Sequence, residues 1–168
     1  MEIKDRARQQ LNWFEKMLHA VPGFKGYYER ELRRDSDKLQ REFVVQKLRA
    51  GKRGLQEATR VLSRKKNLEA LTRFDEMTRL ADKLVNEIRY ADRGYSGFFD
   101  LIKIKEADLD AVYQCDAELA AAAGEWESEC QALAVEPENA ARLGPIQDRL
   151  RQLDERVRQR RELLRGFK

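Results

Sequence analysis

The sequence predicts an all-α protein, an elongated antiparallel helical bundle or coiled coil of about five helices that forms a single domain over residues 1–168. Its 168 residues include only three prolines and nine glycines, too few for a fold with many turns. Charged residues make up 38% of the chain, against about 25% in an average globular protein, so the core must be thin. Apolar residues recur every three or four positions, which is the period of an amphipathic helix.

The first expected helix covers residues 3–20 and is amphipathic. We expect it to end before Val21, because Pro22 disfavours the helical conformation of the residue that precedes it, and Gly23 completes the break. Basic side chains lie beside its apolar face. The apolar positions step by three or four residues: Ile3, Ala7, Leu11, Phe14, Leu18 and Val21.

The second expected helix covers about residues 27–49. Gly51 and Gly54 mark a weak point, after which residues 55–66 either continue this helix or form a short separate one. A third helix is expected over residues 68–90. Its broad apolar face consists of Leu71, Met77, Leu80, Ala81, Leu84, Val85 and Ile88.

The fourth and fifth helices are expected over residues 106–134 and from residue 140 or 145 to 164. In the fifth, the apolar seam weakens where it meets Arg160 and Arg161. We expect the third, fourth and fifth helices to form a three-helix core, with the N-terminal half added to it. The apolar positions are Val112, Cys115, Leu119, Ala122, Trp126, Cys130 and Leu133 in the fourth helix, and Ile146, Leu150, Leu153 and Val157 in the fifth.

Charge alternates along the chain. Residues 1–66 hold 18 basic and 9 acidic side chains, residues 67–139 hold 7 and 17, and residues 140–168 hold 9 and 4. The chain therefore divides into an amphipathic N-terminal helix (1–21), a basic segment (24–66), an acidic helical hairpin (67–134) and a basic C-terminal helix (140–168). We expect these charges to pair between helices of the bundle, and the alternative is a basic surface for an anionic partner.

The sequence gives little support for catalysis, so we expect no enzyme activity, catalytic residue, cofactor or small-molecule substrate. His19 is the only histidine, and no nucleotide-binding or nucleophile motif occurs. Cys115 and Cys130 lie about 22 Å apart along one helix at roughly 1.5 Å per residue. They can share neither a disulfide nor a zinc ion, and we expect both to be buried free thiols. We therefore expect no metal site.

The expected location is the cytoplasm, with peripheral attachment to the inner membrane as an alternative. No stretch approaches 18 consecutive apolar residues, which argues against a spanning helix. The N-terminal residues 1–5 do not resemble the start of a signal peptide. Two cysteines without an export signal are typical of a reducing compartment.

Three segments are candidate binding elements. The first helix either docks on the bundle or lies on a membrane surface. The glycine–aromatic segment after it either presents backbone amides to a phosphate or turns the chain. A second such segment, near residue 95, either closes one end of the bundle or exposes aromatic side chains to a partner. The candidate residues are Trp13, Phe14 and Met17, then Gly23, Phe24, Lys25, Gly26 and Tyr27, then Tyr95, Phe98 and Phe99.

The two glycine–aromatic segments also carry a resemblance. The chain contains Gly-Phe-Lys-Gly-Tyr at residues 23–27, followed by Arg33-Arg34 and Asp37-Lys38, and Gly-Tyr-Ser-Gly-Phe-Phe-Asp at residues 94–100. It resembles a group of uncharacterised bacterial helical proteins over roughly residues 20–120, although Phe24 replaces their more usual tyrosine. Genes for such proteins often lie near those for membrane-associated SPFH (band 7) and zinc-ribbon proteins. The resemblance implies a cytoplasmic helper of a membrane assembly and no known activity.

We therefore expect a non-enzymatic scaffold or adaptor that acts through protein–protein contacts, with a protein partner or self-association. One alternative is a peripheral membrane-surface protein that binds anionic lipid through the N-terminal amphipathic helix. A second is a nucleic-acid-binding protein, which we do not favour because the net charge is only +4 and no reader motif occurs. The basic residues that nucleic acid would use are Lys52, Arg53, Arg64, Lys65 and Lys66.

Overall fold

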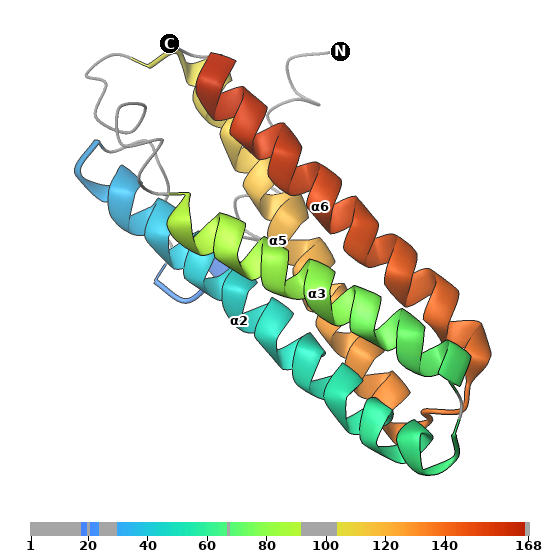
Figure 1. The fold of residues 1–168 in the computed structure, drawn as a ribbon. Helices are drawn as coiled ribbons and strands as arrows, with labels where there is room; N and C mark the ends of the chain where they lie inside the picture. The colour runs from blue at the N-terminus through green and yellow to red at the C-terminus, as the bar shows by residue number, and fades with distance from the viewer. Residues whose placement is uncertain (1–17, 20, 24–29, 67, 92–103, 167–168) are drawn as a thin grey trace, which may run out of the picture.

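A computed structural model describes residues 18–19, 21–23, 30–66, 68–91 and 104–166. Its elements are the helices α2 (Arg30–Arg64), α3 (Leu68–Tyr90), α5 (Glu106–Val135) and α6 (Leu143–Gly166), with the short 3-10 helix η1 (Ala140–Arg142) before α6 (Figure 1). The all-α prediction is confirmed. The helix expected over residues 3–20 lies outside the described residues apart from Leu18 and His19, which are helical, so the count of five helices stays a prediction.

The four long helices form two hairpins that pack side by side. α2 and α3 run antiparallel, as do α5 and α6, and both connecting turns lie at the same end of the bundle (Figure 1). The most extensive contact joins α2 to α5, and further contacts join α2 to α3, α5 to α6 and α3 to α6. The expected core of three C-terminal helices is therefore wrong, because α2 is a full member of a four-helix bundle.

Close packing explains why α2 continues through its two glycines. A Cβ atom at Gly51 would overlap the indole ring of Trp126, and one at Gly54 would lie 2.7 Å from the carbonyl oxygen of Cys130. Each glycine costs about 1 kcal/mol of helix propensity relative to alanine, but together they let the backbones of α2 and α5 approach each other. The expected weak point is thus a tight helix contact.

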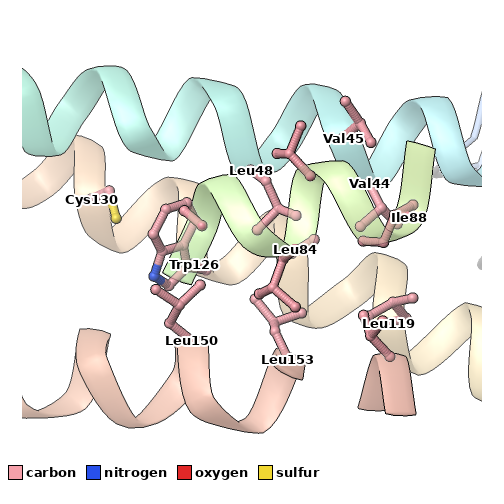
Figure 2. Packing of buried hydrophobic residues seen from close by; sticks show 14 of the residues in the cluster. Val44, Val45, Leu48, Leu84, Ile88, Leu119, Trp126, Cys130, Leu150 and Leu153 are labelled. Atoms are coloured by element: carbon pink, nitrogen blue, oxygen red, sulfur yellow. The ribbon is translucent and has the colours of Figure 1, made fainter. Parts of the chain in front are cut away.

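The core runs along the centre of the bundle and takes side chains from all four helices. Figure 2 shows Leu48 of α2, Leu84 of α3, Trp126 of α5 and Leu150 of α6 converging. Burial of a large side chain of this kind stabilises a fold by about 1.5–3 kcal/mol. The helices are therefore held together mainly by their apolar stripes.

The buried positions of α5 only partly match the predicted stripe. Cys130 is buried, but Cys115 is half-buried, as is Ala122. A second set of side chains is buried because α5 contacts both α2 and α6, so two of its faces are covered. The buried residues outside the predicted stripe are Leu109, Tyr113, Asp116, Ala120 and Ala123.

Ion pairs join helices of opposite net charge, as the charge distribution predicts. Lys47 of α2 pairs with Glu127 of α5 at 2.7 Å, and Lys52 of α2 pairs with Asp82 of α3 at 2.6 Å. Arg149 of α6 pairs with Glu129 of α5 at 2.9 Å, and this hydrogen bond raises the pKa of Arg149. Partly exposed pairs of this kind contribute little stability each.

Candidate binding surfaces at the two ends of the bundle

Most of the predicted binding residues fall in chain segments that the structure does not describe. Gly23 is the exception. Its backbone φ is +80°, a conformation that favours glycine, and a Cβ atom there would contact Leu39 of α2 at 3.4 Å. Gly23 therefore serves as a turn residue. The predicted residues outside the described part are Trp13, Phe14, Met17, Phe24, Lys25, Gly26, Tyr27, Tyr95, Phe98 and Phe99.

The described residues with catalytic potential are few and scattered. His19 is exposed. Burial, with the neighbouring Asp116 carboxylate, raises the pKa of Cys115 to about 12, and burial also raises the pKa of Cys130. Both thiols are therefore protonated at neutral pH and are poor nucleophiles. Within the described ranges, no cluster of three or more histidine, cysteine, aspartate or glutamate side chains could hold a metal ion.

The basic residues considered for nucleic acid do not form an unopposed patch. The Lys52 amine contacts both carboxylate oxygens of Asp82, and Lys65 pairs with Glu138. Arg53, Arg64 and Lys66 are exposed. A phosphate approaching this surface would compete with two carboxylates, which weakens the electrostatic attraction that nucleic-acid binding needs.

A buried ion network is the main feature that the sequence reasoning missed. Arg160 of α6 donates from Nε to Asp116 of α5 at 2.5 Å and from Nη2 to Asp37 of α2 at 2.5 Å. The second oxygen of Asp37 accepts from Nε of Arg41 at 2.8 Å. All four side chains are buried, and the network ties three helices together at the end of the bundle away from the turns.

Helical spacing contains the signal that could have found this network. In α6, the buried residues follow helical spacing. Arg160 comes after Leu150, Leu153 and Val157 in this series, and the buried Leu164 ends it. The expectation that the seam weakens at Arg160 is therefore wrong. Arg41 and Arg33 of α2 are also buried. A charge at an apolar heptad position predicts an opposite charge on the facing helix.

A pocket of about 540 Å³ opens beside the network, and we call it the arginine pocket. Four arginines line it: Arg41, Arg160, Arg161 and Arg165. Glu87 is the one acidic residue of its described lining and pairs with Arg161 at 2.9 Å. Apolar side chains complete the described walls, among them Ile88, Leu119 and Val157. The described lining thus combines positive charge with apolar surface.

Gln40 also lines the arginine pocket and is fully buried. Among the described residues, neither its amide nitrogen nor its amide oxygen has a hydrogen-bond partner. An unpaired buried amide of this kind costs about 1–3 kcal/mol. A buried amide that no described residue satisfies therefore lies in the wall of the arginine pocket.

The opposite end of the bundle exposes apolar side chains. Val135 at the end of α5 is 83% exposed, Leu68 at the start of α3 is 75% exposed, and Val61 near the end of α2 is 38% exposed. Val61 and Val135 line one shallow pocket of about 340 Å³. We call Val61, Leu68 and Val135 the turn-end cluster, since they lie at the end where both hairpins turn (Figure 1).

None of the described helices combines the length and apolar character that crossing a membrane would require. Comparison with protein-family models, with curated proteins and with solved structures gave no match to this chain.

Proposed function

We propose that the protein is a non-enzymatic helical adaptor that acts through protein–protein contacts, and that the turn-end cluster is its main contact surface. The observation that carries the proposal is the exposure of Val135 at the end of α5 and of Leu68 at the start of α3. Apolar side chains that cluster on a surface favour a partner, because covering them removes apolar area from water. Protonated, high-pKa thiols support a non-enzymatic role.

The proposal also includes the expectations from the sequence about the fifth helix, the packing of the helices and the location of the protein. A fifth, amphipathic helix over residues 3–20 adds to the bundle, and the helices of the bundle pack as a coiled coil. The adaptor acts in the cytoplasm, where the resemblance to proteins encoded near SPFH (band 7) proteins favours a partner that belongs to a membrane assembly. Charges around the turn-end cluster, such as Lys65 and Glu138, give its rim both signs, which suits a protein surface better than a nucleic acid.

Two variants of α5 test the proposal as a matched pair. Val135→Glu places a carboxylate in the turn-end cluster, and Ala121→Glu places the same group at an exposed position elsewhere on α5. The purified chains are immobilised and incubated with an extract of the producing cells, and the retained proteins are quantified by mass spectrometry. Sedimentation velocity of each chain measures self-association.

A partner or a self-association that is lost in Val135→Glu and in Leu68→Glu but kept in Ala121→Glu is the expected result. Equal binding by all variants would refute the turn-end cluster as the contact surface. Flotation with anionic and neutral liposomes, run on the full chain and on a chain without residues 1–21, tests the membrane alternative. Anionic-lipid binding that disappears with the truncation would replace the adaptor proposal by a membrane-surface protein.

A further inference from the structure

We propose that the arginine pocket is a binding site for a small organic monocarboxylate with an apolar body. This site lies at the end of the bundle opposite the turn-end cluster, so it is independent of the adaptor surface. Its volume of about 540 Å³ falls in the range of roughly 300–1,000 Å³ that is typical of small-molecule sites.

The buried amide of Gln40 is the first argument for a ligand. The side chain is fully buried and lines the pocket, and neither polar atom has a hydrogen-bond partner in the described part of the chain. A primary amide offers two donors and one acceptor oxygen. A carboxylate that enters the pocket can accept from the amide nitrogen once the buried Gln40 side chain turns toward it, which removes part of the cost of burying this group without a partner.

The charge of the described lining is the second argument. Arg161 uses its Nη2 group on Glu87, and Arg165 uses its Nη1 group on the exposed Glu162 at 3.5 Å. Since a guanidinium carries five N–H donors, both residues keep donors for an anion. Hydrogen bonds between guanidinium and carboxylate are among the stronger ones in proteins.

The same surroundings favour one negative charge over two. Glu87 lies in the described lining, and Asp37 and Asp116 lie directly behind Arg160. A phosphate dianion would be repelled by these three carboxylates, whereas a carboxylate brings only a single charge. The arrangement therefore selects a monocarboxylate rather than a phosphate.

Apolar walls select the rest of the ligand. The buried side chains of Ile88, Leu119 and Val157 line the pocket, and Tyr90, which is 59% exposed, stands at its edge. An aliphatic or aromatic body on the carboxylate would cover this surface and gain the hydrophobic contribution of the area removed from water. Acetate, which lacks such a body, would gain almost none of it.

Isothermal titration calorimetry on the full chain tests the proposal. The probes are octanoate and phenylacetate, their neutral amides octanamide and phenylacetamide, acetate and inorganic phosphate. We expect at least one of the two apolar carboxylates to bind, and to bind at least about tenfold more tightly than its own amide, acetate or phosphate. Tighter binding of octanoate would identify the ligand as an aliphatic, lipid-derived acid. Tighter binding of phenylacetate would identify it as an aromatic acid.

Two arginines of α6 provide a matched pair of variants. Arg165 and Arg151 are both exposed, and each pairs with an acidic residue three positions earlier at 3.5 Å. Only Arg165 belongs to the pocket lining. Arg165→Gln is expected to weaken carboxylate binding about tenfold or more, while Arg151→Gln leaves it unchanged. Gln40→Met, which keeps the length of the side chain but removes the amide, is expected to weaken it as well.

Three results would overturn the proposal: no apolar carboxylate binds the folded chain, the neutral amides bind as tightly as the acids, or Arg151→Gln weakens binding as much as Arg165→Gln. Circular dichroism confirms that each variant is folded. If Gln40→Met does not fold, the comparison of Arg165→Gln with Arg151→Gln decides, because both of these substitutions lie on the exposed surface of α6.

Discussion

Replacing a glycine by alanine should have opposite effects at two positions of this bundle. At Gly124, in the interior of α5, no atom of the described residues beyond the local helix backbone lies within 4 Å of an added Cβ. Alanine there gains helix propensity without a clash, and we expect Gly124→Ala to raise the free energy of unfolding by about 0.5–1 kcal/mol. At Gly54 the same methyl group meets the backbone of α5.

The magnitude at Gly54 follows from the distances. The added Cβ would lie 2.7 Å from the carbonyl oxygen of Cys130 and 2.8 Å from its carbonyl carbon. An ordinary contact begins near 3.4 Å, so α2 and α5 must separate by about 0.7 Å. Backbone atoms cannot rotate away as a side chain can. Overpacking of this kind costs typically about 1–3 kcal/mol, and it acts on the most extensive helix contact of the bundle.

The helix-propensity gain is the same in both variants and cancels in their comparison. Gly54→Ala should therefore be less stable than Gly124→Ala by about 1–3 kcal/mol. Urea unfolding followed by circular dichroism gives both free energies by linear extrapolation. If the two variants were stabilised equally, the close approach of α2 and α5 at Gly54 would be refuted.

Three further predictions concern the buried charges and the thiols. Arg160→Met should lower the free energy of unfolding by about 3–5 kcal/mol, because it removes a guanidinium that two buried carboxylates, Asp37 and Asp116, both contact; in urea unfolding, a loss below about 1 kcal/mol would contradict their burial. Native Cys130 should react with a thiol reagent more slowly than the half-buried Cys115, and both should react quickly in urea; fast native labelling of Cys130, read by mass spectrometry, would contradict its place in the core. Above about pH 9 the unfolded chain loses its thiol protons while the folded chain keeps them, so stability should fall by about 1.4 kcal/mol per pH unit for each thiol. Urea unfolding from pH 8 to 11 should show a smaller fall in Cys115→Ala than in the unchanged chain, and an equal fall would contradict the raised pKa of Cys115.

The sequence alone was sufficient to predict the fold class and most of the helix boundaries. The helix expected over residues 68–90 is α3, and the helix expected over 106–134 is α5 to within one residue. Both predictions rest on apolar periodicity, which burial imposes directly on a sequence. Pro145 lies in the first turn of α6, where proline is tolerated, so this helix begins earlier than its proline suggests.

The failures come from residues whose role depends on a neighbour. Gly54 resembles a helix breaker until Cys130 of another helix is placed against it. Arg160 resembles the end of an apolar seam until Asp37 and Asp116 are placed beside it. Periodicity in one segment does not reveal which other segment faces it. The arginine pocket was missed for the same reason, because its described lining comes from four helices.

The network around Arg160 also constrains how the bundle can be assembled. One guanidinium contacts carboxylates on two different helices, Asp37 of α2 and Asp116 of α5. Sliding α6 by a single turn, about 5.4 Å, would bring a leucine or a valine to these carboxylates and carry Arg160 into apolar surroundings. Leucine and valine seams alone tolerate such a shift, whereas a shared buried cation does not. The three residues thus set the register of α6, and a change at any one of them would have to be matched at the other two.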